Sequence, residues 1–327
     1  MIAEIRGIGS FVPEKIITNE ELAQTVDTTD GWIREHTGIE KRRIIAPGEA
    51  ASDMAIRAAR MALERAQVGP EELDLIITAT ATPDYSNFPA TACLIQHELG
   101  AEHSGAFDLA AGCTGFIYGL SVARGMILAG DYRNILVVGT EALSRITNWQ
   151  DRNTCVLFGD GAGAAVVSAN NNQDNRGILQ TMLRSEGAGG EHLMRRAGGS
   201  RMPFTPGMDP AETFISMNGR RVYGFAVRVC TILINSLLRK ANLHLRDIKH
   251  IVPHQANERI IQAAAERLSI SLDKFYLNIA EYANTSSASI PIALREMEEK
   301  DLLHKGDLIL TLAFGAGLTY GGLLIRW

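Results

Sequence analysis

The sequence has 327 residues, of which 46% are hydrophobic and 21% charged, a composition typical of a globular protein with a large core. A formal net charge of −5 argues against a nucleic-acid-binding protein, which usually carries a strong basic excess. The N-terminal segment lacks the basic start and apolar run of a signal peptide, and no apolar run approaches the roughly 18 residues of a membrane span. We therefore expect a cytoplasmic protein with no membrane or nucleic-acid partner.

The first half of the chain alternates helical and strand patterns. We expect Asn19 to cap a short helix, and residues 52–66 to form an amphipathic helix with an apolar face. Residues 73–80 form a continuous apolar run, which predicts a strand buried on both faces. A helix from Pro89 to Gly100 and a second buried strand at 134–139 follow.

The second half repeats this order of elements. In both halves, two buried strands are followed by a glycine-rich segment that leads into a further strand. The matching pairs are 73–80 with 248–253, 134–139 with 307–313, and 158–163 with 314–317. Three matches in one order indicate a duplicated α/β unit.

Two segments lack periodicity. The polar residues 170–176 are predicted to join the two halves, which we place at 1–170 and 171–327. Residues 187–211 are rich in Gly, Arg, Met and Pro. A loop of this length is either a cover over a site or a mobile surface excursion, and both interpretations stay open.

The four cysteines are Cys93, Cys113, Cys155 and Cys230, and no pair has the Cys-x-x-Cys spacing of a zinc site. We predict no metal site, and we expect most of the four cysteines to be free, buried thiols. Cys93 falls within a helical pattern, Cys155 within a strand-like run and Cys230 within a long helical pattern. These three are interpreted as ordinary core residues.

Cys113 has different surroundings. An apolar segment precedes it and a helical pattern follows, so the thiol is expected at a strand-to-helix turn. The unpaired N–H groups and dipole of a helix start favour thiolate and would lower the pKa of Cys113. Gly112 and Gly115 would let other backbone or a ligand approach closely. On these residues alone, a small buried side chain remains an equal alternative.

Two further residues are candidates for the same site. His254 follows a buried strand directly, in Pro-His-Gln-Ala-Asn at 253–257, and α/β folds place function at such strand ends. Asn284 begins the polar cluster Asn-Thr-Ser-Ser-Ala-Ser, for which helix capping is the default interpretation. The glycine-rich segment 158–164 does not predict a phosphate loop, because no Lys-Ser/Thr pair follows and a strand comes next.

Five motifs together carry a family resemblance. They are Ala-Ala-Gly-Cys-Thr-Gly-Phe at 110–116, Phe-Gly-Asp-Gly-Ala-Gly at 158–163, Pro-His-Gln-Ala-Asn at 253–257, Asn-Thr-Ser at 284–286 and Phe-Gly-Ala-Gly at 314–317. The chain resembles, along its whole length, the β-ketoacyl-acyl carrier protein synthase III family of the thiolase superfamily. The resemblance implies a five-layered α/β/α/β/α fold built from two duplicated halves, and a homodimer.

The resemblance also implies an acyltransferase reaction that initiates fatty acid synthesis. Cys113 would take an acyl group, with acetyl the expected primer, from acyl-coenzyme A, and malonyl-acyl carrier protein would then lose CO₂ and attack it. His254 Nε2 and the Asn284 amide would donate hydrogen bonds to the malonyl thioester oxygen, and the N–H groups of Cys113 and Ala316 would hold the oxyanion. Coenzyme A enters as a substrate thioester, and no cofactor is implied.

Binding residues follow from the same resemblance. The coenzyme A channel would be lined by Thr28, Trp32, Arg152, Gly219, Tyr223, Ala256 and Asn257. Trp32 and Arg152 would enclose the adenine, although Trp32 could instead be a half-buried core aromatic. The acyl pocket would contain Phe314 and would receive Phe88 of a partner subunit. A basic rim for an acidic carrier protein would consist of Arg220, Arg221, Arg259 and Arg267, although for each Arg singly a solvated helix face is the favoured interpretation.

The chain departs from the family pattern at five positions. His36 stands where many members have Arg, Tyr223 replaces the commoner Phe, and Gly224 stands where some members have Lys. Leu318 and Tyr320 replace a usual Phe and Trp. These departures leave the acyl-chain length, the carrier contacts and the affinity for coenzyme A open.

Three other functions remain as alternatives. The first is a cysteine hydrolase, whose Cys-His-Asn triad would have the same order along the chain. Against it, Cys113 lacks the neighbouring residues of the papain group, and such a hydrolase does not fit the duplicated α/β pattern. A related synthase of secondary metabolism would share every catalytic residue. A non-enzymatic protein that binds acyl groups or coenzyme A is the third. Within the superfamily, an elongating synthase would pair its Cys with two His, and a degradative thiolase would have a second Cys where this chain has Phe314. The set Cys113, His254 and Asn284 therefore resembles that of an initiating synthase.

Overall fold

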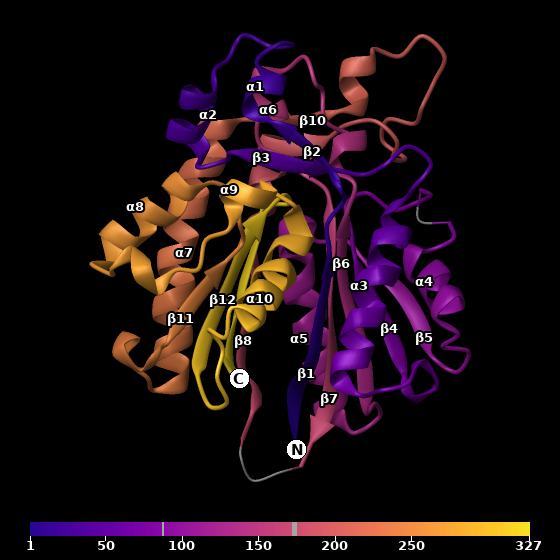
Figure 1. The fold of residues 1–327 in the computed structure, drawn as a ribbon, viewed down its shortest axis with the longest axis vertical. Helices are drawn as coiled ribbons and strands as arrows, with labels where there is room; N and C mark the ends of the chain where they lie inside the picture. Colours follow the sequence, from indigo (N-terminus) through magenta and orange to yellow (C-terminus); the bar gives the residue numbers. More distant parts are fainter. Residues whose placement is uncertain (87, 172–174) are drawn as a thin grey trace.

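Two stacked β-sheets with helices outside and between them form the molecule (Figure 1). The computed structural model describes residues 1–86, 88–171 and 175–327. The first sheet has the strand order β1-β7-β6-β4-β5, and the second β11-β12-β13-β8. The first sheet comprises β1 Ile2–Phe11, β7 Gly161–Asn170, β6 Asn134–Glu141, β4 Leu75–Ala79 and β5 Gly105–Leu109. The second comprises β11 His250–Pro253, β12 Leu308–Gly315, β13 Thr319–Arg326 and β8 Gly177–Ser185.

Corresponding strands occupy equivalent places in the two sheets. β4 runs parallel to β6, as β11 runs parallel to β12, and β7 and β13 each lie antiparallel to both of their neighbours. Predicted segments 73–80 and 248–253 become β4 and β11, and 134–139 and 307–313 become β6 and β12. The division at 170/171 stays a prediction, and part of the proposed joining segment, 172–174, lies outside the described residues.

Helices supply the other three layers (Figure 1). The outer helices of the first sheet are α3 Ala51–Ala66 and α4 Thr91–Leu99, and those of the second are α7 Gly219–Ala241 and α8 Glu258–Leu268. Between the sheets lie α5 Gly115–Ala129 and α10 Ser289–Glu299. The shorter elements are β2 Lys15–Thr18, α1 Asn19–Leu22, α2 Asp30–Thr37, β3 Lys41–Ile44, α6 Arg152–Cys155, β9 Leu193–Arg195, β10 Ile215–Met217 and α9 Ile279–Tyr282. The five-layered α/β/α/β/α prediction is confirmed.

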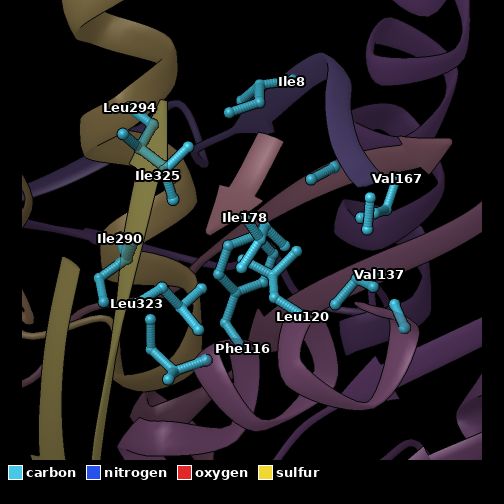
Figure 2. Packing of buried hydrophobic residues seen from close by; sticks show 14 of the residues in the cluster. Ile8, Phe116, Leu120, Val137, Val167, Ile178, Ile290, Leu294, Leu323 and Ile325 are labelled. Carbon is cyan, nitrogen blue, oxygen red and sulfur yellow. The ribbon is translucent and has the colours of Figure 1, made fainter. Parts of the chain in front are cut away.

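The central core lies between the two sheets (Figure 2). Phe116 and Leu120 of α5, and Ile290 and Leu294 of α10, contact inward-facing strand residues and are at most 2% exposed. Their strand partners are Ile8, Val137, Val167, Ile178, Leu323 and Ile325. Full burial of each such side chain contributes about 1.5–3 kcal/mol. This packing holds α5 in place directly after the 3₁₀ turn that contains Cys113.

Helix α3 approaches the first sheet very closely at a glycine of β1. A Cβ atom on Gly9 would lie 2.1 Å from the carbonyl oxygen of Ala58, which is far inside van der Waals contact. Glycine is required here because any side chain would push α3 off the sheet. The strand sequence therefore sets how closely this outer layer packs.

Two segments have the length and composition that could cross a membrane, Gly112–Ala129 and Gly219–Ala241. The prediction that no apolar run approaches that length was therefore wrong by this measure. In the fold, α5 lies between the two sheets and α7 covers the second, and 44% and 50% of the two apolar windows are buried. Both helices act here as layers of the core.

Two predicted helix starts also differ. Thr18, not Asn19, caps α1, because the Thr18 hydroxyl accepts the N–H of Glu21 while Asn19 is buried within the helix. Helix α4 begins at Thr91, two residues after the predicted start at Pro89. The helix predicted over 52–66 is confirmed as α3.

Candidate active site

Cys113 lies in a 3₁₀ turn, Gly112–Thr114, between β5 and α5. The predicted strand-to-helix turn is thus confirmed. Gly112 has a φ of 52°, and a Cβ atom there would lie 3.2 Å from the Cβ of Ala316. This close approach brings the hairpin between β12 and β13 against the nucleophile turn. The backbone N–H groups of Cys113 and Ala316 act to lower the pKa of the Cys113 thiol.

The prediction of a lowered pKa for Cys113 was wrong. Burial raises the pKa of this thiol to about 11, although hydrogen bonds from Ser286 and the two backbone N–H groups act in the opposite direction. Cys113 is therefore a thiol in the resting protein, and its proton must leave when it attacks.

The other three cysteines are free as well, but their settings differ in part from the predictions. Cys93 lies in α4 and is exposed, so the prediction that it is buried was wrong. Cys155 is buried but ends helix α6 and does not lie in a strand. Cys230 is buried in α7, as predicted.

His254 follows the end of β11 and is 1% exposed. Its Nδ1 lies 2.7 Å from the Ser289 hydroxyl at the start of α10, and its ring contacts Phe314 edge-on at 5.6 Å between centroids. Burial lowers the pKa of His254 to about 3. The imidazole is therefore neutral at physiological pH, with Nε2 as the ring nitrogen available to a substrate.

Asn284 follows α9 and does not cap α10, whose N-cap is Ala288. The Asn284 side-chain Oδ1 accepts the backbone N–H of Ser286 at 2.9 Å. The backbone N–H of Asn284 donates to the Leu157 carbonyl oxygen at 2.9 Å. Because Oδ1 is occupied, Nδ2 is the group that can donate to a substrate. The default capping interpretation is replaced by a fixed amide donor.

Cys113, His254 and Asn284 line one cavity of about 130 Å³. Most of its other lining is apolar, including Leu193 and Phe314. The cavity opens into a groove of about 1130 Å³. The residues that line both spaces are Leu157, Met217, Gly219, Tyr223 and Asn257. The groove therefore leads directly to the thiol.

The segment 187–211 contributes to this enclosure. It contains a 3₁₀ helix and the strand β9, and β9 pairs with β10. Leu193 of β9 and Met217 of β10 both line the inner cavity. Part of the segment is thus a cover over the site, which favours the first of the two interpretations.

Most residues predicted to bind coenzyme A line the two spaces. Five of them line the groove, and Ala256 lines the inner cavity, whereas Thr28 is not among the lining residues of either. The Arg152 guanidinium lies 4.7 Å from the centre of the Trp32 ring, and that ring stacks on His36 at 4.3 Å. The space between Trp32 and Arg152 is therefore closed, and the guanidinium must move before an adenine can enter it.

The remaining predicted residues are spread around the mouth of the site. Arg220 and Arg259 line the groove, and Arg221 lines a neighbouring surface hollow. Arg267 lies near the other end of α8, roughly 12 Å from Arg259 at 1.5 Å per residue. Phe88 is 94% exposed.

Three polar residues of the site were missed by the sequence predictions. Ser286 and Ser289 belong to the cluster interpreted as caps, and they contact Cys113 and His254 respectively. Glu141, the last residue of β6, is completely buried beside them. An acidic residue at the end of the apolar run 134–139 was the available signal, since α/β folds place function at strand ends.

Comparison with known proteins gives matches along the chain. The family model for 3-oxoacyl-[acyl-carrier-protein] synthase III matches residues 107–187, and the model for the C-terminal part of the same enzyme matches 238–327. β-Ketoacyl-[acyl-carrier-protein] synthase III of Caldanaerobacter subterraneus subsp. tengcongensis is 51% identical, with 99% of this chain and 98% of the relative covered. The same-named protein of Clostridium acetobutylicum is 48% identical at 99% and 98% coverage.

Solved structures agree with these relatives. The synthase III of Aquifex aeolicus has a TM-score of 0.91 at 44% identity, covering 99% of this chain and 100% of the other. The priming β-ketosynthase of the R1128 polyketide biosynthetic pathway has a TM-score of 0.91 at 35% identity, covering 99% and 96%. Fold and relatives together define an acyl-transferring condensing enzyme. Within that class, the chain belongs to the β-ketoacyl-[acyl-carrier-protein] synthase III family.

Proposed function

We propose that this protein condenses an acyl-coenzyme A primer, with acetyl-coenzyme A the first candidate, with malonyl-acyl carrier protein in the cytoplasm. The product is a β-ketoacyl-carrier protein, which begins a fatty acid. The observation that carries the proposal is the convergence of Cys113, His254 and Asn284 on one small cavity that opens into a groove. The names of the relatives support the same reaction.

The first half-reaction is acylation of Cys113. The Cys113 sulfur attacks the primer thioester, its thiol proton leaves, and coenzyme A departs as the carbonyl re-forms. The N–H groups of Cys113 and Ala316 favour negative charge on the sulfur, which supports their holding the oxyanion that forms beside it. This arrangement supports a covalent acyl-Cys113 intermediate.

The second half-reaction uses His254 and Asn284. Malonyl-carrier protein loses CO₂, and the enolate oxygen that develops accepts hydrogen bonds from His254 Nε2 and Asn284 Nδ2. The carbanion attacks acyl-Cys113 and releases the sulfur. Because His254 is neutral, Nε2 carries the proton only when Nδ1 is the acceptor of the ring. The Ser289 hydroxyl, which donates to the Ser286 carbonyl oxygen at 2.9 Å, must then turn to donate to Nδ1. No metal or cofactor takes part in this scheme, because decarboxylation generates the carbanion.

The groove supports the proposed binding of coenzyme A and of the carrier protein. Trp32 and Arg152 offer two flat groups for the adenine, and Arg220 and Arg259 offer positive charge at the mouth. An exposed phenylalanine is a common feature of an interface, so Phe88 supports a homodimer in which it enters the partner's acyl pocket.

The test is incubation with acetyl-coenzyme A and malonyl-carrier protein, with products identified by mass spectrometry. A β-ketoacyl-carrier protein is expected. Free acid without that product would identify a hydrolase instead.

The likeness to a polyketide priming ketosynthase keeps a synthase of secondary metabolism as the second candidate function. A panel of longer and branched primers separates the two candidates. Preference for a primer other than acetyl would favour the second.

A further inference from the structure

A buried carboxylate lies directly behind the nucleophile turn. Glu141 is 0% exposed and receives four hydrogen bonds, two on each oxygen. The donors are the Ala81 N–H at 3.0 Å, the Thr82 hydroxyl at 3.0 Å, the Ser286 hydroxyl at 3.0 Å and the Ser287 hydroxyl at 2.8 Å. All four are neutral, and no cation is among the groups that set its pKa. A buried carboxylate without a charged partner is costly, which indicates a role beyond stability.

Ser286 connects this carboxylate to Cys113. Its side chain acts to lower the pKa of the Cys113 thiol, and its hydroxyl donates a hydrogen bond to Glu141 Oε1 at 3.0 Å. Ser286 also has a φ of 50°, in the left-handed region that a residue with a side chain rarely adopts. The bond from its N–H to Asn284 Oδ1 holds it in that conformation. Such strained residues concentrate at functional sites.

The proposed reaction needs an acceptor for the Cys113 proton, and His254 is a poor one. Its ring is buried, its pKa is strongly lowered, and Nδ1 bonds a serine and not a carboxylate. Glu141 also acts on Cys113 through its charge, which raises the pKa of the thiol. Glu141 is thus the carboxylate that a proton from Cys113 can reach through a single hydroxyl.

We propose that Ser286 and Glu141 form a proton relay that stores the Cys113 proton between the two half-reactions. During acylation the S–H proton passes to Ser286 Oγ, the Ser286 proton passes to Glu141 Oε1, and the new C–S bond forms as coenzyme A leaves as a thiolate. During condensation the acyl–sulfur bond breaks, and the proton returns from Glu141 through Ser286 to Cys113. Glu141 ends each cycle as a carboxylate, and solvent protonates the departed coenzyme A thiolate.

The relay rests on the proposed function, and two serine variants test it separately from that function. Ser286→Ala removes the link to the sulfur, whereas Ser287→Ala removes a donor to the same Glu141 oxygen but leaves that link. The rate of Cys113 acylation, followed by intact mass, should fall about 100-fold or more in Ser286→Ala and by less than about threefold in Ser287→Ala, as loss of a general base predicts. CO₂ release from malonyl-carrier protein, in which Cys113 loses no proton, should stay near the wild-type rate in both.

The pH dependence of acylation supplies a second readout. Burial raises the pKa of Glu141 to about 6, and only its carboxylate form accepts a proton, so the wild-type acylation rate should rise as pH increases through about 6. Glu141→Gln should remove that rise, and Glu141→Asp should restore it in part. Thermal denaturation of each variant identifies any that fail to fold.

Equal losses of acylation in the Ser286→Ala and Ser287→Ala proteins would overturn the relay, because they would indicate a purely structural carboxylate. An unchanged pH rise in a folded Glu141→Gln protein would overturn it as well. A wild-type protein that never acylates Cys113 would instead contradict the proposed function.

Discussion

The Asn284→Asp substitution tests the role of the amide most cleanly. The change keeps Oδ1, which accepts the Ser286 N–H at 2.9 Å, and removes the Nδ2 donor. Loss of one donor to a developing oxyanion costs about 2.7–4 kcal/mol, which corresponds to a decrease of about 100- to 1000-fold. A carboxylate in the mainly apolar cavity would also repel the enolate, so the larger value is expected.

The assay measures the two half-reactions separately. Release of CO₂ from malonyl-carrier protein should fall by that factor, and the rate of Cys113 acylation should change by less than about threefold, because Nδ2 is not used in that step. Asn257→Asp is the matched comparison, since Asn257 lines the same cavity and its Oδ1 accepts the Arg259 N–H. It should alter the KM for acyl-coenzyme A and leave decarboxylation unchanged. An equal loss of both half-reactions in Asn284→Asp would refute the assigned role.

Three further substitutions have defined outcomes. Ser289→Ala should slow decarboxylation roughly 5- to 150-fold and leave KM unchanged, because the catalytic imidazole of His254 loses a buried hydrogen bond that contributes about 1–3 kcal/mol. An unaltered rate would contradict the positioning role of Ser289. Arg152→Ala should raise the KM for acyl-coenzyme A without changing kcat. Arg239→Ala should change neither, because Arg239 lies roughly 30 Å along α7 from Gly219 at the groove; equal effects of the two substitutions would exclude an adenine contact. Gly9→Ala should lower the free energy of unfolding by about 1–3 kcal/mol, whereas Gly125→Ala should raise it, because a Cβ at Gly125 meets open space. Denaturant titration measures both free energies, and a Gly9→Ala protein as stable as the wild type would contradict the close packing of α3 on β1.

The fold could be predicted from sequence because its signals are local and repeated. Strands buried on both faces give continuous apolar runs, and these runs recur in one order in both halves, so the strands β4, β6, β11 and β12 were found. Helix boundaries were less accurate where distant groups decide them. Helix α4 starts at Thr91 because the Asp108 carboxylate, from β5, accepts the N–H groups of Thr91 and Ala92 at 2.8 Å each. Nothing near Pro89 in the sequence reveals that partner.

The candidate site likewise has residues that the sequence indicates and properties that depend on the assembled fold. Cys113, His254 and Asn284 stand in recognisable motifs, so the sequence indicates them directly. Their electrostatics depend on burial, which is a property of the assembled fold, and burial reverses the expected shift in the pKa of Cys113. The roles of Ser286 and Glu141 depend on a contact between residues 145 positions apart. No spacing rule links residues at that distance.

The central claim is that Cys113 carries the primer between two substrates. Intact-mass spectrometry of the protein after incubation with acetyl-coenzyme A alone tests it directly. The account predicts one added acetyl group, located on Cys113 by peptide mapping, absent from a Cys113→Ala protein and removed when malonyl-carrier protein is added. Formation of the β-ketoacyl product without any acetylated protein, or by the Cys113→Ala protein, would contradict it.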